Sequence, residues 1–165
     1  MASNMGTTCS TAAKSCSRPA TWSARLTTPT GAPWDLVAGG DPRTYADLVT
    51  PAGLRQIARY ADALGPDKTQ IVPQDGAGAS LPATTVVWDA HRVGLAVLPY
   101  TFRNENAFLP AELRCGADPG AYGDAFTEYG QFLRLGVDGV FTDNGDTARE
   151  ARDSYALGRR RGAVG

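Results

Sequence analysis

The sequence predicts an α/β fold built on a parallel sheet. Two short apolar runs, Leu95–Leu98 and Val137–Thr142, are typical of buried strands, and amphipathic helical patterns precede and follow them. Strands that alternate with helices along a chain pair in parallel, because each helix returns the chain across one face of the sheet in a right-handed crossover. The length of 165 residues is that of one domain.

The first 45 residues carry the weakest structural signals. Residues 1–22 are rich in Ser, Thr and Ala and show no period of 2 or 3.6, so we expect a disordered or non-native leader. A weak extended segment, ARLTTP, begins at Ala24. Glycines and prolines predict a loop over residues 31–45, in which we expect Trp34 to bury its ring against the body of the protein.

Thr50 and Pro51 predict the start of the first secure helix, since Thr is a good N-cap and Pro suits the first helical position. Its apolar face, which repeats at intervals of three and four before Gly65, consists of Leu54, Ile57, Ala61 and Leu64. Residues 63–72 then predict a short strand or turn, which prolines and glycines interrupt.

A second helix is predicted to open at Leu81 and Pro82 and to stop at Gly94, immediately before the first apolar strand. Its apolar face consists of Val86, Val87, Ala90 and Val93.

A third helix is predicted to begin at Asp118–Pro119, which repeats the pattern of a cap followed by proline, and to end at Gly136. It carries a stripe that is far more typical of a core than of a cofactor site, formed by Tyr122, Phe126, Tyr129 and Leu133. The second apolar strand follows, and Asp146 is predicted to cap a last helix.

Polar residues follow both apolar strands. After the first come Tyr100, Thr101, Arg103, Asn104, Glu105 and Asn106, and after the second come Thr142, Asp143 and Asn144. Ligands collect at the carboxyl ends of parallel strands, so these two strand ends form the candidate binding site. The alternative interpretation, equally favoured by the spacing, is that Arg103 and Glu105 belong to a solvated loop.

Composition argues against several classes of protein. The net charge is −1 and the basic residues are dispersed, apart from a run in a basic tail at residues 158–165, so nothing indicates nucleic-acid binding. No stretch approaches the roughly 20 apolar residues of a membrane span, and the first residues lack the apolar core of a secretory signal. Cys9, Cys16 and Cys115 fit neither a disulfide framework nor a zinc site.

Four segments carry a resemblance to a known family: GAPWDL (31–36), TPAGLRQIARYADALGPDK (50–68), AHRVGLAVLPYTFRNENAFLP (90–110) and GVDGVFTDNGDTA (136–148). Together they resemble the C-terminal half of glycerophosphodiester phosphodiesterases, and the likeness covers residues 31 to about 153. The resemblance implies a TIM-like (β/α) barrel of which residues 23–157 form approximately strands five to eight. It also implies that the complete enzyme hydrolyses glycerophosphodiesters to glycerol 3-phosphate and an alcohol with a bound divalent cation, calcium or magnesium.

The family's catalytic motifs do not occur in this chain. They are a His-Arg-Gly, a Glu-x-Asp and a further His, whereas this chain has a single histidine, His91, in a predicted helix where a surface or packing role is favoured. Leu98 stands where relatives usually have His, which puts some substrate contacts in doubt. We therefore expect no catalytic residue, no metal ligand and no cofactor in this chain, and no hydrolysis by it alone.

The residues that match the family at the strand ends, and that the resemblance implies for substrate binding, are Tyr100, Arg103, Thr142 and Asp143. Arg103 is the natural partner of a phosphate through its fixed fork of donors. Asp143 has an alternative role as a cap of backbone N–H groups. Weak capture of a hard cation would use Asp143, Asp146 and Glu105.

Two hypotheses remain open. The chain is either part of a glycerophosphodiester phosphodiesterase, whose remaining motifs would be encoded upstream, or a non-catalytic half-barrel module for binding or assembly. In both cases four strands would leave two open sheet edges, and we expect self-association through them.

Overall fold

The computed structural model describes residues 23–26 and 30–162, so the expected leader at 1–22 lies outside the described residues. The described elements are, in order, β1 (Ser23–Leu26), α1 (Trp34–Ala38), α2 (Tyr45–Leu48), α3 (Pro51–Ile57), β2 (Ala63–Pro66), α4 (Lys68–Ile71), α5 (Val86–Arg92), β3 (Ala96–Val97), the 3-10 turns η1 (Asn106–Phe108) and η2 (Ala111–Leu113), α6 (Ala125–Leu135) and α7 (Gly145–Gly162). None of the described helices has both the length and the hydropathy that crossing a membrane requires.

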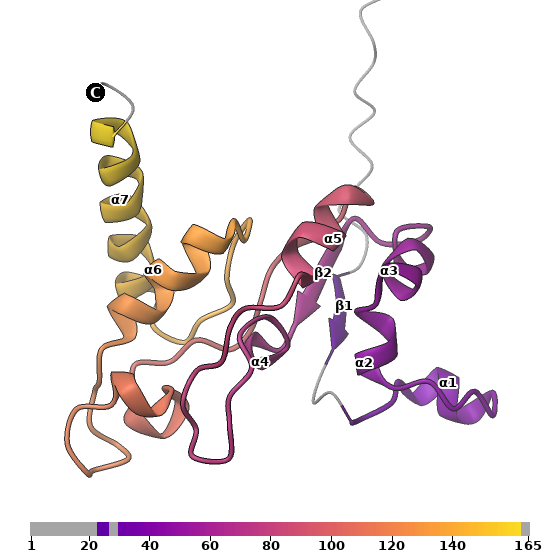
Figure 1. The fold of residues 1–165 in the computed structure, drawn as a ribbon, viewed down its shortest axis with the longest axis horizontal. Coiled ribbons are helices and arrows are strands. Elements are labelled where there is room, and N and C mark those ends of the chain that lie inside the picture. Colours follow the sequence, from indigo (N-terminus) through magenta and orange to yellow (C-terminus); the bar gives the residue numbers. More distant parts are fainter. Residues whose placement is uncertain (1–22, 27–29, 163–165) are drawn as a thin grey trace, which may run out of the picture.

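The described strands form one parallel sheet in the order β1-β2-β3. Ser23 lies opposite Ala63, and Leu64 of β2 lies opposite Val97 of β3. This parallel pairing confirms the α/β class. In Figure 1 the helices α1, α2 and α3 lie toward the β1 side of the sheet, and α6 and α7 lie at the other end of the molecule.

Residues 137–142, predicted to be a strand, run beside β3 in the predicted direction without forming a regular strand. Asp138 N donates to Val97 O and Phe141 N donates to Pro99 O, both at 2.9 Å, and Phe102 forms a parallel bridge with Thr142. The two donors are three positions apart while their acceptors are two apart. One extra residue therefore breaks the regular ladder, as in a bulge.

The start of α3 confirms the cap prediction, since Thr50 Oγ1 accepts a hydrogen bond from Gly53 N at 3.2 Å. The predicted end at Gly65 is wrong, because the helix stops at Ile57. Leu64 belongs to β2, where its carbonyl accepts from Leu98 N at 2.8 Å. The strand of this region is thus Ala63–Pro66, and the pair Ile71–Val72 follows it at the end of α4.

Helix α5 begins at Val86, later than predicted, because the residues before it are tied to α4. Thr84 N donates to Ile71 O and Thr84 Oγ1 donates to Gln70 O, each at 2.8 Å. Gly94 follows the helix with a φ of +82°, a left-handed conformation that glycine adopts without strain. The predicted stop at this glycine is therefore confirmed.

The predicted start of the third helix at Asp118–Pro119 is wrong. Helix α6 begins at Ala125 and is capped by Asp124, whose Oδ1 accepts from Thr127 N at 3.0 Å. The Asp118 carbonyl instead accepts from the Asn106 side chain at 2.8 Å, a contact that belongs to a loop. The predicted aromatic stripe is correct only in part, because Tyr129 is buried whereas Tyr122 and Phe126 are exposed.

The last helix begins at Gly145, and Ala148 N donates to Asn144 O at 3.1 Å. Asn144 therefore stands at the cap position predicted for Asp146. Asp146 lies in the first turn, where a carboxylate still interacts favourably with the helix dipole. The helix continues to Gly162 and includes most of the basic segment at 158–165.

The loop predicted over residues 31–45 contains helix α1 and reaches the start of α2. The prediction that Trp34 buries its ring is also wrong, because this residue is 82% exposed. Pro33 precedes α1 and accepts a hydrogen bond from Val37 N at 3.1 Å, so the proline starts a turn of helix here rather than interrupting one.

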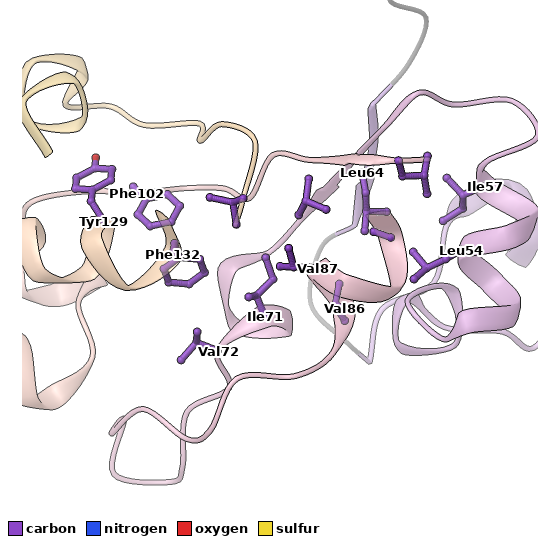
Figure 2. Packing of buried hydrophobic residues seen from close by; sticks show 14 of the residues in the cluster. Leu54, Ile57, Leu64, Ile71, Val72, Val86, Val87, Phe102, Tyr129 and Phe132 are labelled. Atoms are coloured by element: carbon purple, nitrogen blue, oxygen red, sulfur yellow. The ribbon is translucent and has the colours of Figure 1, made fainter. Parts of the chain in front are cut away.

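The hydrophobic core runs along the whole sheet. Leu54, Ile57 and Leu64 pack at one end, while Phe102, Tyr129 and Phe132 pack at the other (Figure 2). The Phe102 ring stacks on Tyr129 and meets Phe132 edge-on, with centroids 5.0 Å apart in both pairs. These aromatic contacts fix the residue directly before Arg103 against α6.

Candidate substrate-binding site

Arg103 lies where the two polar strand ends meet. Its Nη2 is 2.5 Å from Asp143 Oδ2, and its Cζ lies 4.5 Å from the centroid of the Phe108 ring. The arginine side chain remains 38% exposed. The structure thus brings together two of the predicted site residues, and it adds an aromatic ring that the sequence did not indicate.

The backbone explains why Arg103 and Asp143 meet. Phe102 N donates to Phe141 O at 2.9 Å, and Asp143 N donates to Phe102 O at 3.2 Å. These bonds place Arg103 opposite Asp143. The Asp143 carboxylate pairs with the guanidinium, while the first turn of α7 is closed by the Asn144 carbonyl.

Thr142 and Tyr100 form hydrogen bonds with neighbouring residues of the protein. Thr142 Oγ1 lies 2.5 Å from the Tyr129 hydroxyl and accepts from Asn144 N at 2.9 Å. Burial raises the pKa of Tyr129, and the bond with Thr142 opposes that effect. Tyr100 is only 8% exposed, and its carbonyl accepts from Lys68 N at 2.9 Å. Both residues border the candidate site and are tied to Tyr129, Asn144 and Lys68 by these contacts.

The sequence did not indicate the buried ion pair of Lys68 and Glu128 that lies beneath the candidate site. Lys68 Nζ lies 2.6 Å from Glu128 Oε1, and the same ammonium donates to Phe108 O at 2.7 Å. Burial raises the pKa of Glu128, and the nearby Lys68 charge opposes this. The partners are separated by 60 positions. No local pattern could have paired them.

The two asparagines of the RNEN segment hold the loop that follows Arg103. Asn104 N donates to Asn144 Oδ1 at 3.1 Å, and Asn104 Nδ2 donates to Thr147 Oγ1 at 2.9 Å. Asn106 Nδ2 donates to the carbonyls of Cys115 and Asp118, each at 2.8 Å. The polar cluster after the first strand was visible in the sequence, but the partners of these amides were not.

The carboxylates near Arg103 do not fit a divalent cation. Within residues 23–26 and 30–162, no group of three or more His, Cys, Asp or Glu side chains is placed so that it could hold a metal ion. The expected trio of Asp143, Asp146 and Glu105 therefore does not form a site, and Asp143 is engaged by Arg103.

His91 lies at the opposite end of β3. Its Nε2 is 2.8 Å from Asp138 Oδ2, and the same carboxylate oxygen accepts from Val97 N at 2.7 Å. Arg103 is six residues beyond Val97 along the chain, a stretch that spans at most about 20 Å. His91 is thus engaged by Asp138, and the candidate-site pair is formed by other residues, Arg103 and Asp143.

A parallel α/β sheet that presents a partly exposed arginine at the carboxyl ends of its strands is typical of enzymes that bind anionic ligands. Comparison with known proteins gives the family. The Glycerophosphoryl diester phosphodiesterase family model matches residues 5–147, and the chain belongs to this family. The match begins inside the segment 1–22 that we expect to be a leader.

Similar proteins include three from Arabidopsis thaliana. Glycerophosphodiester phosphodiesterase GDPD6 is 40% identical over 102 residues, which are 61% of this chain and 25% of that protein. Glycerophosphodiester phosphodiesterase GDPDL7 is 38% identical over 98 residues, or 59% of this chain and 12% of that protein. GDPDL1 is 30% identical over 118 residues, or 71% and 14%. The chain thus matches a quarter or less of the length of these relatives.

Proposed function

We propose that this chain is the phosphate-binding half of a glycerophosphodiester phosphodiesterase. In this proposal β1, β2, β3 and residues 137–142 correspond approximately to strands five to eight of a TIM-like barrel. The reaction of the complete enzyme cleaves a phosphodiester to glycerol 3-phosphate and an alcohol. Family membership and the order of the parallel strands support the assignment.

The observation that carries the proposal is the placement of Arg103. Phosphodiester cleavage needs compensation of the negative charge on the phosphoryl oxygens, and a guanidinium offers several N–H donors in one plane. Asp143 binds Nη2 of Arg103, and the partial exposure of the side chain leaves other donors open to a ligand. The carboxyl end of the strands is also where barrel enzymes bind substrate.

The remaining chemistry belongs to groups that this half does not supply. The leaving alkoxide needs a proton and the attacking oxygen must lose one, yet the only histidine, His91, pairs with Asp138 and not with a residue of the candidate site. We infer that a calcium or magnesium ion of the complete family enzyme is held by other residues, since the described carboxylates do not gather around a common point. The isolated chain is therefore expected to bind the phosphodiester without hydrolysing it.

The test is an assay of the purified 165-residue chain with glycerophosphocholine and magnesium, calcium or manganese. We expect glycerol 3-phosphate release to equal that of a control without protein, while the Arg103 resonances shift on addition of the substrate. Release that disappears in His91→Ala would overturn the assignment of the chemistry to other residues. Release that His91→Ala leaves intact, and that follows a minor chromatographic fraction, would identify a contaminating enzyme.

A second candidate is a non-catalytic assembly module, and the open sheet edges favour it. Within the described residues, β1 pairs on one side only, and residues 137–142 pair only with the β3 side. Phe141, at this second edge, is exposed. Unpaired strand edges with apolar neighbours promote pairing with another chain.

Sizing chromatography with light scattering tests the second candidate. We expect self-association at micromolar concentration, with Phe141→Lys shifting the chain toward the monomer, because a charge at the edge opposes strand addition. Trp88→Lys, which changes an exposed aromatic residue on α5, is the matched control. A sharp monomeric peak with cooperative unfolding would contradict this candidate.

A further inference from the structure

We propose that the buried Lys68–Glu128 pair is a positioning device for Arg103, acting through Phe108. The inference rests on the proposed function, in which Arg103 binds the phosphate group of a phosphodiester. It assigns a role to the most deeply buried ion pair described in the chain, which lies behind the substrate-binding site and does not itself face a ligand.

Lys68 is fixed against the segment that leads from β3 to Arg103. Lys68 begins α4, and its backbone N–H donates to the Tyr100 carbonyl at 2.9 Å, three residues before Arg103. Its ammonium lies 5.4 Å from the centroid of the Phe102 ring. Lys68 therefore has a fixed position relative to the carboxyl end of β3.

Glu128 orients the ammonium of Lys68. Its side chain is 3% exposed and it lies in the first turn of α6, which Asp124 caps. A charge at this depth is stable only with an opposite charge and hydrogen bonds, so the Lys68 side chain cannot turn away from Glu128 at low cost. The pair thereby locks α4 and α6 together beneath the loop that follows Arg103.

Phe108 connects the Lys68–Glu128 pair with Arg103. The Lys68 ammonium donates to the Phe108 carbonyl at 2.7 Å, which fixes this residue at the end of η1. The ring of the same residue covers the Arg103 guanidinium at 4.5 Å. Phe108 is 43% exposed, so contacts of the ring with the core do not by themselves hold it in place.

The consequence is an arginine that is oriented before a ligand arrives. The Phe108 ring limits one face of the guanidinium and Asp143 binds its Nη2, so fewer side-chain rotamers are lost when an anion binds. Releasing the Phe108 carbonyl would allow the ring to move off the guanidinium. Phosphodiester affinity would then fall even though Arg103 itself is unchanged.

The experiment follows the Nε–Hε signal of Arg103 by NMR in the full chain, assigned with Arg103→Lys, during titration with glycerophosphocholine. The main variant is Lys68→Met combined with Glu128→Leu, because replacing both partners of a buried pair by apolar residues usually preserves the fold. Phe108→Leu keeps the carbonyl acceptor and removes the ring. Trp88→Leu is the matched control, since it removes a ring from the separate Arg92–Trp88 contact at 4.6 Å.

We expect the Phe108 ring current to shift the Arg103 signal in the wild type. The signal should move in the same direction in the paired variant and in Phe108→Leu, and remain in place in Trp88→Leu. Each of the first two should weaken glycerophosphocholine binding about two- to fivefold, the size of an exposed cation–π contact. Combining them should weaken it no further, because both remove the same contact.

A folded paired variant whose Arg103 signal stays at the wild-type position would overturn the inference. So would a signal that moves without any change in affinity. If Arg103→Ala binds glycerophosphocholine as tightly as the wild type, the proposed function fails instead, and the ring-current measurement separates that result from a failure of the positioning role.

Discussion

Two similar ion pairs lie before and after β3 in the chain. Toward the amino end of β3, His91 Nε2 on α5 lies 2.8 Å from Asp138, and beyond its carboxyl end Arg103 Nη2 lies 2.5 Å from Asp143. Both pairs contact the segment 137–143. Their side chains are also similarly exposed, at 40% and 44% in the first pair and 38% and 51% in the second.

The difference lies in what surrounds each pair. Arg103 has an aromatic ring on its guanidinium, and the buried Lys68–Glu128 pair holds the carbonyl of that aromatic residue. The pair at the amino end has a structural partner instead, because Asp138 also accepts the N–H of Val97. The comparison teaches that two ion pairs of similar geometry can differ in how firmly the surrounding groups hold them, and exposed pairs alone contribute only about 0–1 kcal/mol.

Breaking the Lys68–Glu128 pair beneath Arg103 should give the largest effect, which is on the free energy of unfolding. Lys68→Ala leaves Glu128 buried without its counter-charge, and we expect the free energy of unfolding to fall by about 3–5 kcal/mol. Urea unfolding followed by circular dichroism measures this. The paired variant Lys68→Met/Glu128→Leu should lie within about 1–2 kcal/mol of the wild type, and equal losses in the two variants would show that the cost arises from packing alone.

Removing the arginine should affect binding more than removing a neighbouring hydroxyl. In a complete family enzyme that carries this segment, Arg103→Ala should raise KM for a glycerophosphodiester by the equivalent of about 1.5–3 kcal/mol, the value of a charge-assisted hydrogen bond. Tyr100→Phe should cost about 1 kcal/mol at most, since one neutral hydroxyl is lost. Steady-state kinetics test this ranking, and equal effects of the two changes would contradict it.

At the amino end, the carboxylate should matter more than the histidine. Asp138→Ala leaves the N–H of the buried Val97 without this acceptor, and we expect a loss of about 1–3 kcal/mol in the free energy of unfolding. His91→Ala removes only an exposed ionic partner and should cost less than about 1 kcal/mol. The midpoints of urea unfolding compare the two, and a larger loss for His91→Ala would reverse the interpretation.

The smallest effect concerns pH, because the Lys68 charge offsets part of the burial cost at Glu128. The pKa of Glu128 is raised above its usual 4.5 in the folded protein, so the folded state holds the proton more tightly than the unfolded state. Stability from this group is present below about pH 4.5 and is lost as the pH rises through the folded pKa. Unfolding measured between about pH 4 and pH 7 should show wild type losing stability relative to Glu128→Gln as the pH rises; a relative gain would contradict the sign.

Local chemistry allowed the sequence to determine several features. Thr50 caps α3 because its hydroxyl reaches an N–H three residues away, and Gly94 and Gly136 follow their helices with φ of +82° and +88°. The polar strand ends were also visible, since apolar runs followed by Tyr, Arg, Thr and Asp indicate the carboxyl ends of parallel strands. The meeting of Arg103 with Asp143 follows from that arrangement.

Only the tertiary structure decided the features that depend on distant partners. Asp118–Pro119 has the local pattern of a helix start, but the Asn106 side chain donates a hydrogen bond to the Asp118 carbonyl and keeps the segment in a loop. Leu64 continues a helical period, yet pairing with the neighbouring strands draws it into β2. Local patterns do not predict these outcomes, because contacts with residues from elsewhere in the chain override the local preference.

In the candidate site, too, some features follow from local sequence and others from distant contacts. The sequence by itself determined which side chains stand at the strand ends, because strand direction and residue order are local properties. The support of Arg103 by Phe108, Lys68 and Glu128 was decided by the packing of α4 and α6 beneath the loop. Burial in that packing turns an ordinary lysine and glutamate into a mutually dependent pair, since each charge is stable there only beside the other.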